Sequence, residues 1–189
     1  MTERRSTDPA SGPFRFCPYC ATPLHPIEKG GRRRMACPSC GFIHYRNPTV
    51  GVAAVIVDHG RILLGRRASH SSYPGAWCIP CGHVEWDEDV REAARRECRE
   101  ETGLDVRVGE VVAVHSNFHN PAQHTVGVWF RCEIEGGTLR AGDDLDLVAW
   151  FPLNDLPEPL AFPTDRIVLE ALRRELDEAR NHERLESAL

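Results

Sequence analysis

The stretch at residues 82–104, GHVEWDEDVREAARRECREETGL, predicts a helix with an unusual distribution of charge. We expect Asp87 to cap its N-terminus and Gly103 to end it in the left-handed conformation. At about 100° per residue, four small or apolar residues share one arc, which should face the core. These residues are Val90, Ala93, Ala94 and Cys98.

Three carboxylates lie on or beside that apolar arc. Glu97 and Glu101 fall inside it and Glu100 falls at its edge. Burying carboxylates is costly unless a cation compensates their charge. Their i, i+3, i+4 spacing brings them within a few ångströms of one another. The segment therefore predicts a divalent cation site, and hard oxygen ligands suit Mg²⁺ or Mn²⁺ better than zinc.

Four cysteines near the N-terminus have the spacing of a structural zinc site. The pairs Cys17-x2-Cys20 and Cys37-x2-Cys40 are separated by 16 residues, which fits two knuckles closing one tetrahedron. A segment of about 45 residues with few large apolar side chains cannot bury a sufficient core, so a Zn²⁺ ion would stabilise it. The residues between the pairs predict a hairpin with Gly30-Gly31 at its turn.

Composition indicates two modules in a soluble chain. Of 189 residues, 41% are apolar and 27% are charged, which is ordinary for a globular protein. Residues 1–46 carry eight Lys and Arg against three Asp and Glu, whereas the remainder carries 15 against 25. The polar N-terminus has no signal-peptide pattern, and the longest apolar run, residues 50–57, is too short to span a bilayer. We therefore expect a cytoplasmic location and no membrane partner.

The remaining pattern alternates strands with loops. Apolar runs flank Asp58-His59-Gly60, which predicts a hairpin. Further strands are expected at about residues 106–115, 125–134 and 147–151. A last helix is expected at residues 164–189.

The fixed positions of residues 82–104 match the pattern G-x5-E-x7-R-E-U-x-E-E-x-G-U, so the chain resembles the Nudix hydrolases. Cys98 stands where an aliphatic residue is usual. The resemblance implies an α/β fold, an α/β/α sandwich around a mixed sheet, preceded by a small zinc-ribbon module. We expect a disordered tail at residues 1–13, the zinc ribbon at 14–46, the Nudix domain at 47–160, and a C-terminal helix packing on that domain at 161–189.

The same resemblance implies hydrolysis of a nucleoside diphosphate linked to another moiety. Glu97, Glu100 and Glu101 are then the ligands of Mg²⁺ or Mn²⁺, and the backbone carbonyl of Cys81 adds a further ligand. Arg96 orients the glutamates through an ion pair, since a guanidinium can hold two carboxylate oxygens.

Several further roles remain open at this level. Glu85 and Glu88 are expected as outer metal ligands or as orienting groups. The general base is Glu100, Glu101 or Asp144, and the alternative for Asp144 is an ordinary turn. A homodimer is expected from the resemblance alone.

Substrate preference is inferred from sequence outside the helix. The segment HSNFHNPAQHTVGVWF does not resemble the S-Q-P-W-P-F-P-x-S motif of NADH pyrophosphatases. The ribbon spacing and the final LAFPTDRIVLEAL resemble the ADP-ribose and FAD pyrophosphatase group, so ADP-ribose or FAD is the preferred substrate and NADH the alternative. Arg66 and Arg67 are candidates to bind a phosphate or ribose. Tyr73 and Trp77 are candidates to stack on the base, with packing as the alternative.

Two rival functions are weighed against hydrolysis. The stretch WCIPC at residues 77–81 is similar to a thiol–disulfide redox motif, but loop precedes it and the helix begins too late for its dipole to act on the cysteines. A non-catalytic nucleotide sensor could use the basic ribbon to bind nucleic acid. The intact glutamate set argues against lost catalysis, and a solvated basic turn is the favoured interpretation of Lys29, Arg32, Arg33 and Arg34.

Overall fold

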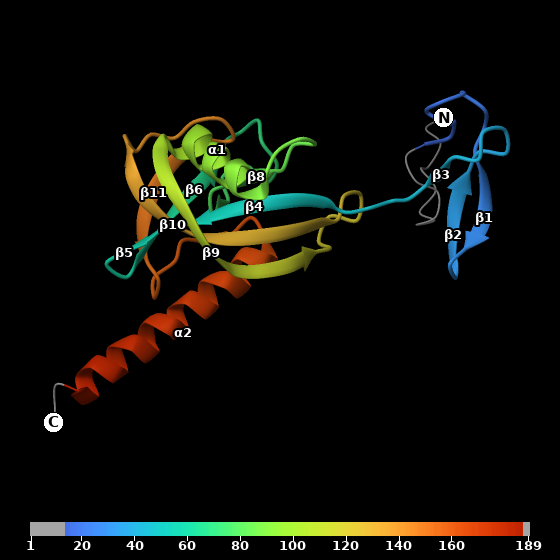
Figure 1. Ribbon diagram of the computed structural model, residues 1–189. Coiled ribbons are helices and arrows are strands. Elements are labelled where there is room, and N and C mark those ends of the chain that lie inside the picture. Colours follow the sequence, from blue (N-terminus) through green and yellow to red (C-terminus); the bar gives the residue numbers. More distant parts are fainter. Residues whose placement is uncertain (1–13, 187–189) are drawn as a thin grey trace. The chain divides into compact units, whose positions relative to one another are not determined.

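The computed structural model describes residues 14–186, and its backbone divides into two units that meet at Asn47 and Pro48 (Figure 1). The predicted disordered tail at residues 1–13 lies outside the described residues, as do the last three residues of the predicted C-terminal helix. Each unit has its own buried core.

The N-terminal unit is a three-stranded antiparallel sheet built beside the four cysteines. Its strands are β1 (His25–Lys29), β2 (Arg32–Ala36) and β3 (Ile43–His44). Gly30 and Gly31 turn the β1–β2 hairpin with φ of 61° and 69°, as predicted, because glycine adopts this left-handed region without steric penalty. The core is small and consists of Cys17, Leu24 and Cys37, with Met35 and Phe42 packed against them.

The second unit contains a mixed sheet, which confirms the expected fold class. Its strands are β4 (Thr49–Val55), β8 (Cys81–His83), β9 (Leu104–Asn117) and β10 (Thr125–Gly137), in the order β8-β4-β10-β9. Strand β10 runs parallel to β4 and antiparallel to β9. A further sheet has the order β11-β6-β5, and its strands are β5 (Val57–Asp58), β6 (Arg61–Arg67) and β11 (Leu145–Pro152). The short strand β7 (Trp77–Cys78) pairs with β6.

Two helices cover opposite faces of this unit, α1 (Val90–Thr102) and α2 (Pro163–Glu186) (Figure 1). Alternate residues of β4 explain this arrangement, because successive side chains of a strand point to opposite faces. Val52 and Ala54 pack in the cluster that contains Ala93, Ala94 and Cys98 of α1. Ala53 and Val55 pack in the cluster that contains Val168, Leu169 and Leu172 of α2.

The predicted start of α1 is wrong by two residues. Asp89, not Asp87, is the N-cap, with φ −69° and ψ 139°, and its side chain accepts the Arg91 N–H at 2.8 Å. Glu88 precedes the N-cap, and its carboxylate binds Arg96. The predicted end is confirmed, since Gly103 is left-handed with φ 70° and its N–H donates to the carbonyl of Arg99.

The WCIPC stretch crosses from one sheet to the other. Trp77 and Cys78 form β7, and Cys81 begins β8. Between them, the N–H of Ile79 donates to Asp165 Oδ2 at 3.1 Å. Since strands flank the stretch and α1 begins only at Val90, it lacks the helix N-terminus that a thiol–disulfide redox site requires.

Asp165, in the first turn of α2, fixes this crossing to the core. Its Oδ1 accepts the Nε1–H of Trp129 at 3.1 Å, and only 1% of the residue is exposed. Burial raises the pKa of Asp165 to about 7, although both hydrogen bonds act in the opposite direction. A raised pKa favours folding below the unfolded-state pKa, and that contribution is lost as pH rises through about 7.

We predict that Asp165→Ala lowers the free energy of unfolding by about 2–5 kcal/mol, because two buried N–H groups lose their acceptor. Urea denaturation at several pH values between about 5 and about 8 should show the difference from wild type shrinking as pH rises. The exposed Asp155→Ala is the control and should change stability by less than about 0.5 kcal/mol. Equal effects of the two substitutions would contradict the role given to Asp165.

Candidate functional site

The three glutamates of the predicted cation site lie in the last turns of α1 and differ in burial. Glu101 is 1% exposed. The side chain of Glu97 is 12% exposed and that of Glu100 is 48% exposed. This gradient follows the helical arc expected from the sequence. The site therefore has one deep, one intermediate and one solvent-accessible carboxylate.

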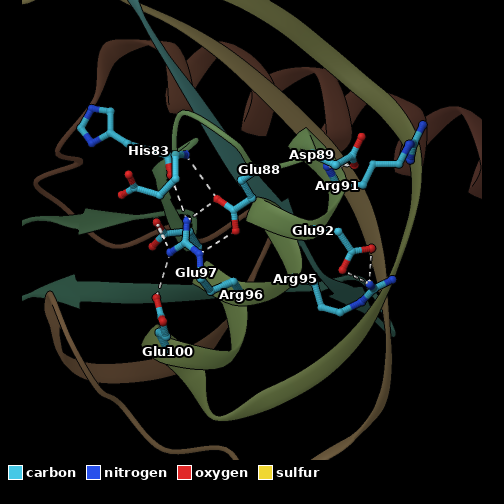
Figure 2. A network of polar contacts seen from close by, with 10 residues as sticks. His83, Glu88, Asp89, Arg91, Glu92, Arg95, Arg96, Glu97 and Glu100 are labelled. Atoms are coloured by element: carbon cyan, nitrogen blue, oxygen red, sulfur yellow. Dashed lines mark hydrogen bonds and ion pairs between the residues drawn. The ribbon is translucent and has the colours of Figure 1, made fainter.

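Arg96 connects these carboxylates to the loop before the helix, and Figure 2 shows the network. Its Nη1 donates to Glu97 at 2.8 Å and to Glu100 at 3.0 Å. Its Nε and Nη2 each donate to Glu88 at 2.8 Å, and Nη2 also donates to the carbonyl of His83 at 3.1 Å. These five hydrogen bonds equal the number of N–H groups on a guanidinium. The bonds to Glu88, Glu97 and Glu100 raise the pKa of Arg96.

Glu88 is committed to Arg96 through both carboxylate oxygens. The bond from Arg96 lowers the pKa of Glu88, and Glu88 also accepts the backbone N–H of Glu85 at 3.3 Å. The side chain of Glu85 itself is exposed. Of the two roles expected for Glu88, the geometry corresponds to the orienting one.

Glu101 is anchored to the backbone of Cys81. Its Oε2 accepts the Cys81 N–H at 2.7 Å. Burial raises the pKa of Glu101 well above its usual range. In an antiparallel ladder the N–H and C=O of one residue point to the same side, and β8 is an edge strand. The carbonyl of Cys81 therefore faces the same open edge as Glu101, while its side chain packs in the apolar cluster with Cys78.

Gly82 allows Glu97 to approach the backbone of β8. A Cβ at Gly82 would lie 1.9 Å from the carboxyl carbon of Glu97, so any larger residue would displace that carboxylate. The fixed glycine of the sequence pattern thus has a steric cause here, and its φ is not in the left-handed region.

The loop at residues 138–144 packs against the C-terminal end of α1. The N–H groups of Arg140 and Gly142 donate to the carbonyls of Thr102 and Glu101 at 2.8 and 3.1 Å, which satisfies carbonyls that a helix end leaves unpaired. This packing brings Asp143 close to Glu97, whose pKa is raised by burial and further by the charges of Glu100 and Asp143. Asp143 is not among the residues that the sequence assigns to the site, and its left-handed φ of 48° marks the turn that places it there.

Asp144 and Arg67 form an ion pair that the sequence does not predict. Arg67 Nη2 lies 2.7 Å from Asp144 Oδ2, with the arginine side chain 6% exposed and the aspartate 42% exposed. Arg67 also donates to the carbonyl and hydroxyl of Ser72. Its guanidinium is therefore engaged within the fold. The neighbouring Arg66 points to solvent and pairs with Asp146 at 2.8 Å.

Tyr73 belongs to an aromatic cluster next to Arg67. Its ring centroid lies 5.2 Å from that of His119 and 5.7 Å from that of Phe162, and Arg67 lies over the Phe162 ring at 5.5 Å. Tyr73 is 40% exposed, so part of its ring is available to a ligand. Trp77 differs, because its half-buried ring packs edge-on against Phe151 in the core at 4.7 Å.

The loop between β9 and β10 joins the aromatic cluster to the glutamate network. It carries His119, which contacts Tyr73, and Gln123, whose Nε2 lies 3.4 Å from Nε2 of His83. The carbonyl of His83 accepts from Arg96. The sequence does not single out His119, Gln123 or Phe162, since their proximity depends on three loops that are distant in the chain.

The four cysteines of the N-terminal unit form a tight cluster. Their Sγ atoms all lie within 4.8 Å of one another, with Cys17 to Cys40 at 3.5 Å and Cys20 to Cys37 at 3.4 Å. A tetrahedral ion with bonds of about 2.3 Å separates its sulfur ligands by about 3.8 Å. The cluster fits Zn²⁺ in number, type and spacing of ligands.

The carboxylate oxygens of the three glutamates are less closely clustered than the four sulfur atoms of the cysteines. Within residues 14–186, the cysteine cluster is the only group of three or more His, Cys, Asp or Glu ligand atoms found that close together. The predicted convergence of Glu97, Glu100 and Glu101 is looser than expected because one Arg96 nitrogen lies between two of them. The raised pKa values of Glu97 and Glu101 reflect burial and mutual repulsion, which a bound cation would relieve.

Known proteins match this architecture. The ADP-ribose pyrophosphatase of Methanocaldococcus jannaschii is 37% identical over 130 residues, covering 68% of this chain and 76% of the relative. The NAD-capped RNA hydrolase NudC of Stutzerimonas stutzeri is 30% identical over 144 residues, covering 76% of this chain. The match spans 50% of that relative's length.

A solved structure and a family model extend the comparison. The crystal structure of a NUDIX hydrolase from Nitrosomonas europaea superposes with a TM-score of 0.75 at 28% identity, covering 89% of this chain and 93% of that one. No helix among the described residues is long and apolar enough to cross a membrane. The NUDIX domain family model matches residues 45–172, and the chain belongs to the NUDIX family.

Proposed function

We propose that this protein is a Mg²⁺- or Mn²⁺-dependent hydrolase that cleaves the diphosphate of a nucleoside diphosphate linked to a second moiety. The observation that carries the proposal is the set Glu97, Glu100 and Glu101 at one helix end, with the first two held by Arg96 and Glu101 held by the N–H of Cys81. Two of these carboxylates have pKa values raised by burial, which a divalent cation would offset.

In this mechanism Glu97, Glu100 and Glu101 hold the cation, together with the backbone carbonyl of Cys81. When bound, the cation neutralises the diphosphate charge and activates water. Arg96 and Glu88 fix the glutamate side chains so that the site is formed before substrate arrives. Glu100, the most exposed of the three glutamates, accepts the proton of the attacking water.

Asp144 has a supporting role in the proposal. Its ion pair with Arg67 holds the loop that follows residue 138 near Glu97. It remains the alternative base, since 42% of its side chain is exposed. Glu85 lies at the rim of the site, where an exposed carboxylate can act as an outer ligand.

ADP-ribose or FAD is the substrate we favour. The similarity to an ADP-ribose pyrophosphatase supports this preference. The aromatic cluster of Tyr73, His119 and Phe162 provides a surface on which a nucleobase can stack. Arg66 can approach the phosphate or ribose from solvent if its exposed pair with Asp146 opens. Arg67 and Trp77 support the loop and the core and are not proposed as direct contacts.

An NAD-linked substrate is the second candidate, either NADH or NAD joined to RNA. It is supported by the relatives named NAD-capped RNA hydrolases, which match most of this chain. A structural Zn²⁺ in the N-terminal unit is part of both proposals. A homodimer and a cytoplasmic location stay predictions from the sequence.

We predict that Glu100→Gln and Glu101→Gln each reduce turnover by about 10²–10⁴-fold, because each removes a charge from the reacting centre. Turnover would be measured as Mg²⁺-dependent cleavage of ADP-ribose, FAD and NADH. Glu92→Gln is the matched control, since Glu92 lies on the outer face of the same helix and pairs only with Arg95 among the described residues. Failure of the wild-type protein to cleave any of the three substrates would overturn the proposal.

Substitutions in β8 test the backbone geometry of the site. Gly82→Ala should lower turnover by about 10–100-fold, since the new methyl group displaces Glu97. Cys81→Gly should leave turnover unchanged or improve it, because the thiol points into the apolar cluster. The same panel of substrates serves for both variants. Full activity of Gly82→Ala would show that Glu97 is not needed in its observed position.

Zinc removal is expected to affect the two units differently. The purified chain should contain one Zn²⁺ per molecule, and Cys17→Ser should abolish it. Loss of the ion should unfold residues 14–46, since metal binding supplies about 10–16 kcal/mol in small zinc modules. Limited proteolysis should then cleave this segment while the NUDIX unit stays intact. Equal protease resistance with and without zinc would contradict the assignment.

A further inference from the structure

The two faces of the ribbon sheet differ in chemistry. The β1–β2 register pairs Lys29 with Arg32 and Ile27 with Arg34, so these four side chains share one face. Tyr45 joins them, because the Arg34 guanidinium lies 4.4 Å from the centre of its ring. We call Ile27, Lys29, Arg32, Arg34 and Tyr45 the basic face.

The opposite face is occupied by the cysteine core. Met35 and His44 are paired across β2 and β3 and therefore lie on that side. Met35 packs on Cys17 and Cys37, and Phe14 packs edge-on against His44 at 4.9 Å. Glu28, the one acidic residue of positions 14–46, also lies on this side, opposite Arg33. The basic face thus carries three cations and no acidic side chain.

The cations of the basic face have no carboxylate partner among residues 14–186. Lys29, Arg32 and Arg34 form no ion pair in this part of the chain, and Nε of Arg34 has no hydrogen-bond acceptor. In the NUDIX unit most arginines are paired, as with Arg66 to Asp146 and Arg107 to Glu133. Positive charge is therefore mostly paired in the NUDIX unit, whereas Lys29, Arg32 and Arg34 of the basic face have no carboxylate partner among the described residues.

The face also carries a partly exposed aromatic ring, one side of which is covered by the Arg34 guanidinium. Tyr45 is 49% exposed and Ile27 is 36% exposed. An exposed aromatic ring beside unpaired cations is the combination that binds single-stranded nucleic acid, with the ring stacking on a base and the cations contacting phosphates. Residues 47–189 carry 15 Lys and Arg against 25 Asp and Glu, so the long-range attraction of a polyanion is stronger at the ribbon than at the remainder.

We propose that the basic face binds single-stranded RNA, with Tyr45 contacting a base and the three cations contacting phosphates. The inference rests on the proposed function, whose second candidate substrate is NAD joined to RNA. The sequence favours a solvated turn for these residues. The structure adds the common face, the unpaired charges and the exposed tyrosine, none of which the sequence shows.

Fluorescence anisotropy with a 3′-labelled single-stranded RNA of about 12 nucleotides tests the proposal on the full-length chain. Three phosphate contacts predict a slope of about −2 for log affinity against log salt concentration. Lys29→Gln and Arg32→Gln should each reduce the magnitude of this slope by about 0.7. Tyr45→Ala should weaken binding about tenfold, and Tyr45→Phe should not.

Arg33→Gln is the matched control, since it removes the same charge from the opposite face and should leave the slope unchanged. The basic-face variants should keep their zinc and cleave ADP-ribose at the wild-type rate. Glu100→Gln should bind RNA like the wild type, so loss of hydrolysis and loss of RNA binding are distinguishable. Together these results would support the proposal.

Four results would overturn it. The first is no anisotropy change at low salt, and the second is an Arg33→Gln effect as large as that of Arg32→Gln. The third is equal affinity for single-stranded DNA of the same sequence, which would remove the assignment to RNA. The fourth is that substitutions on the basic face change the sedimentation coefficient of the protein and leave RNA binding unchanged. That result would assign the basic face to contact with a second copy of the chain.

Discussion

The five hydrogen bonds of Arg96 are the interaction on which the candidate site depends. They tie the last turns of α1 to Glu88 and to the carbonyl of His83, so the loop before the helix and the end of the helix form one rigid body. Three carboxylates would repel one another without a cation among them. In this protein the guanidinium pairs with Glu97 and Glu100, while Glu101 is held by the N–H of Cys81.

Close backbone approach is the second constraint. Because Gly82 has no side chain, β8 can lie against the carboxylate of Glu97. Gly142 does the same for the loop at residues 138–144, since a Cβ added there would lie 2.5 Å from the carbonyl oxygen of Glu100. The two glycines lie on opposite sides of the helix end in sequence terms, one before α1 and one after it. Backbone from both segments therefore lies against the last turns of α1, which leaves little room for a larger side chain at either glycine.

The parts of the structure that follow from local pattern were predictable, and those that follow from distant pairing were not. The arc of Ala93, Ala94 and Cys98 places the glutamates because helical periodicity is local. Asp165 and Trp129 are separated by 36 residues, and Arg67 and Asp144 by 77. Nothing in their own neighbourhoods indicates these pairs. The error at Asp87 has a different cause, since either aspartate can cap a helix and the sequence pattern alone does not choose between them.

The crossing between β7 and β8 has a mechanical consequence. Trp77 and Cys78 belong to the sheet of β6 and β11, whereas Cys81 belongs to the sheet of β4 and β10. Two residues, Ile79 and Pro80, connect them, and the first is held by Asp165 of α2. A change in the angle between the sheets must then shift Cys81 against Glu101. The spacing between Cys81 and Glu101 is thus coupled to the packing of the whole sandwich, including contacts far from α1.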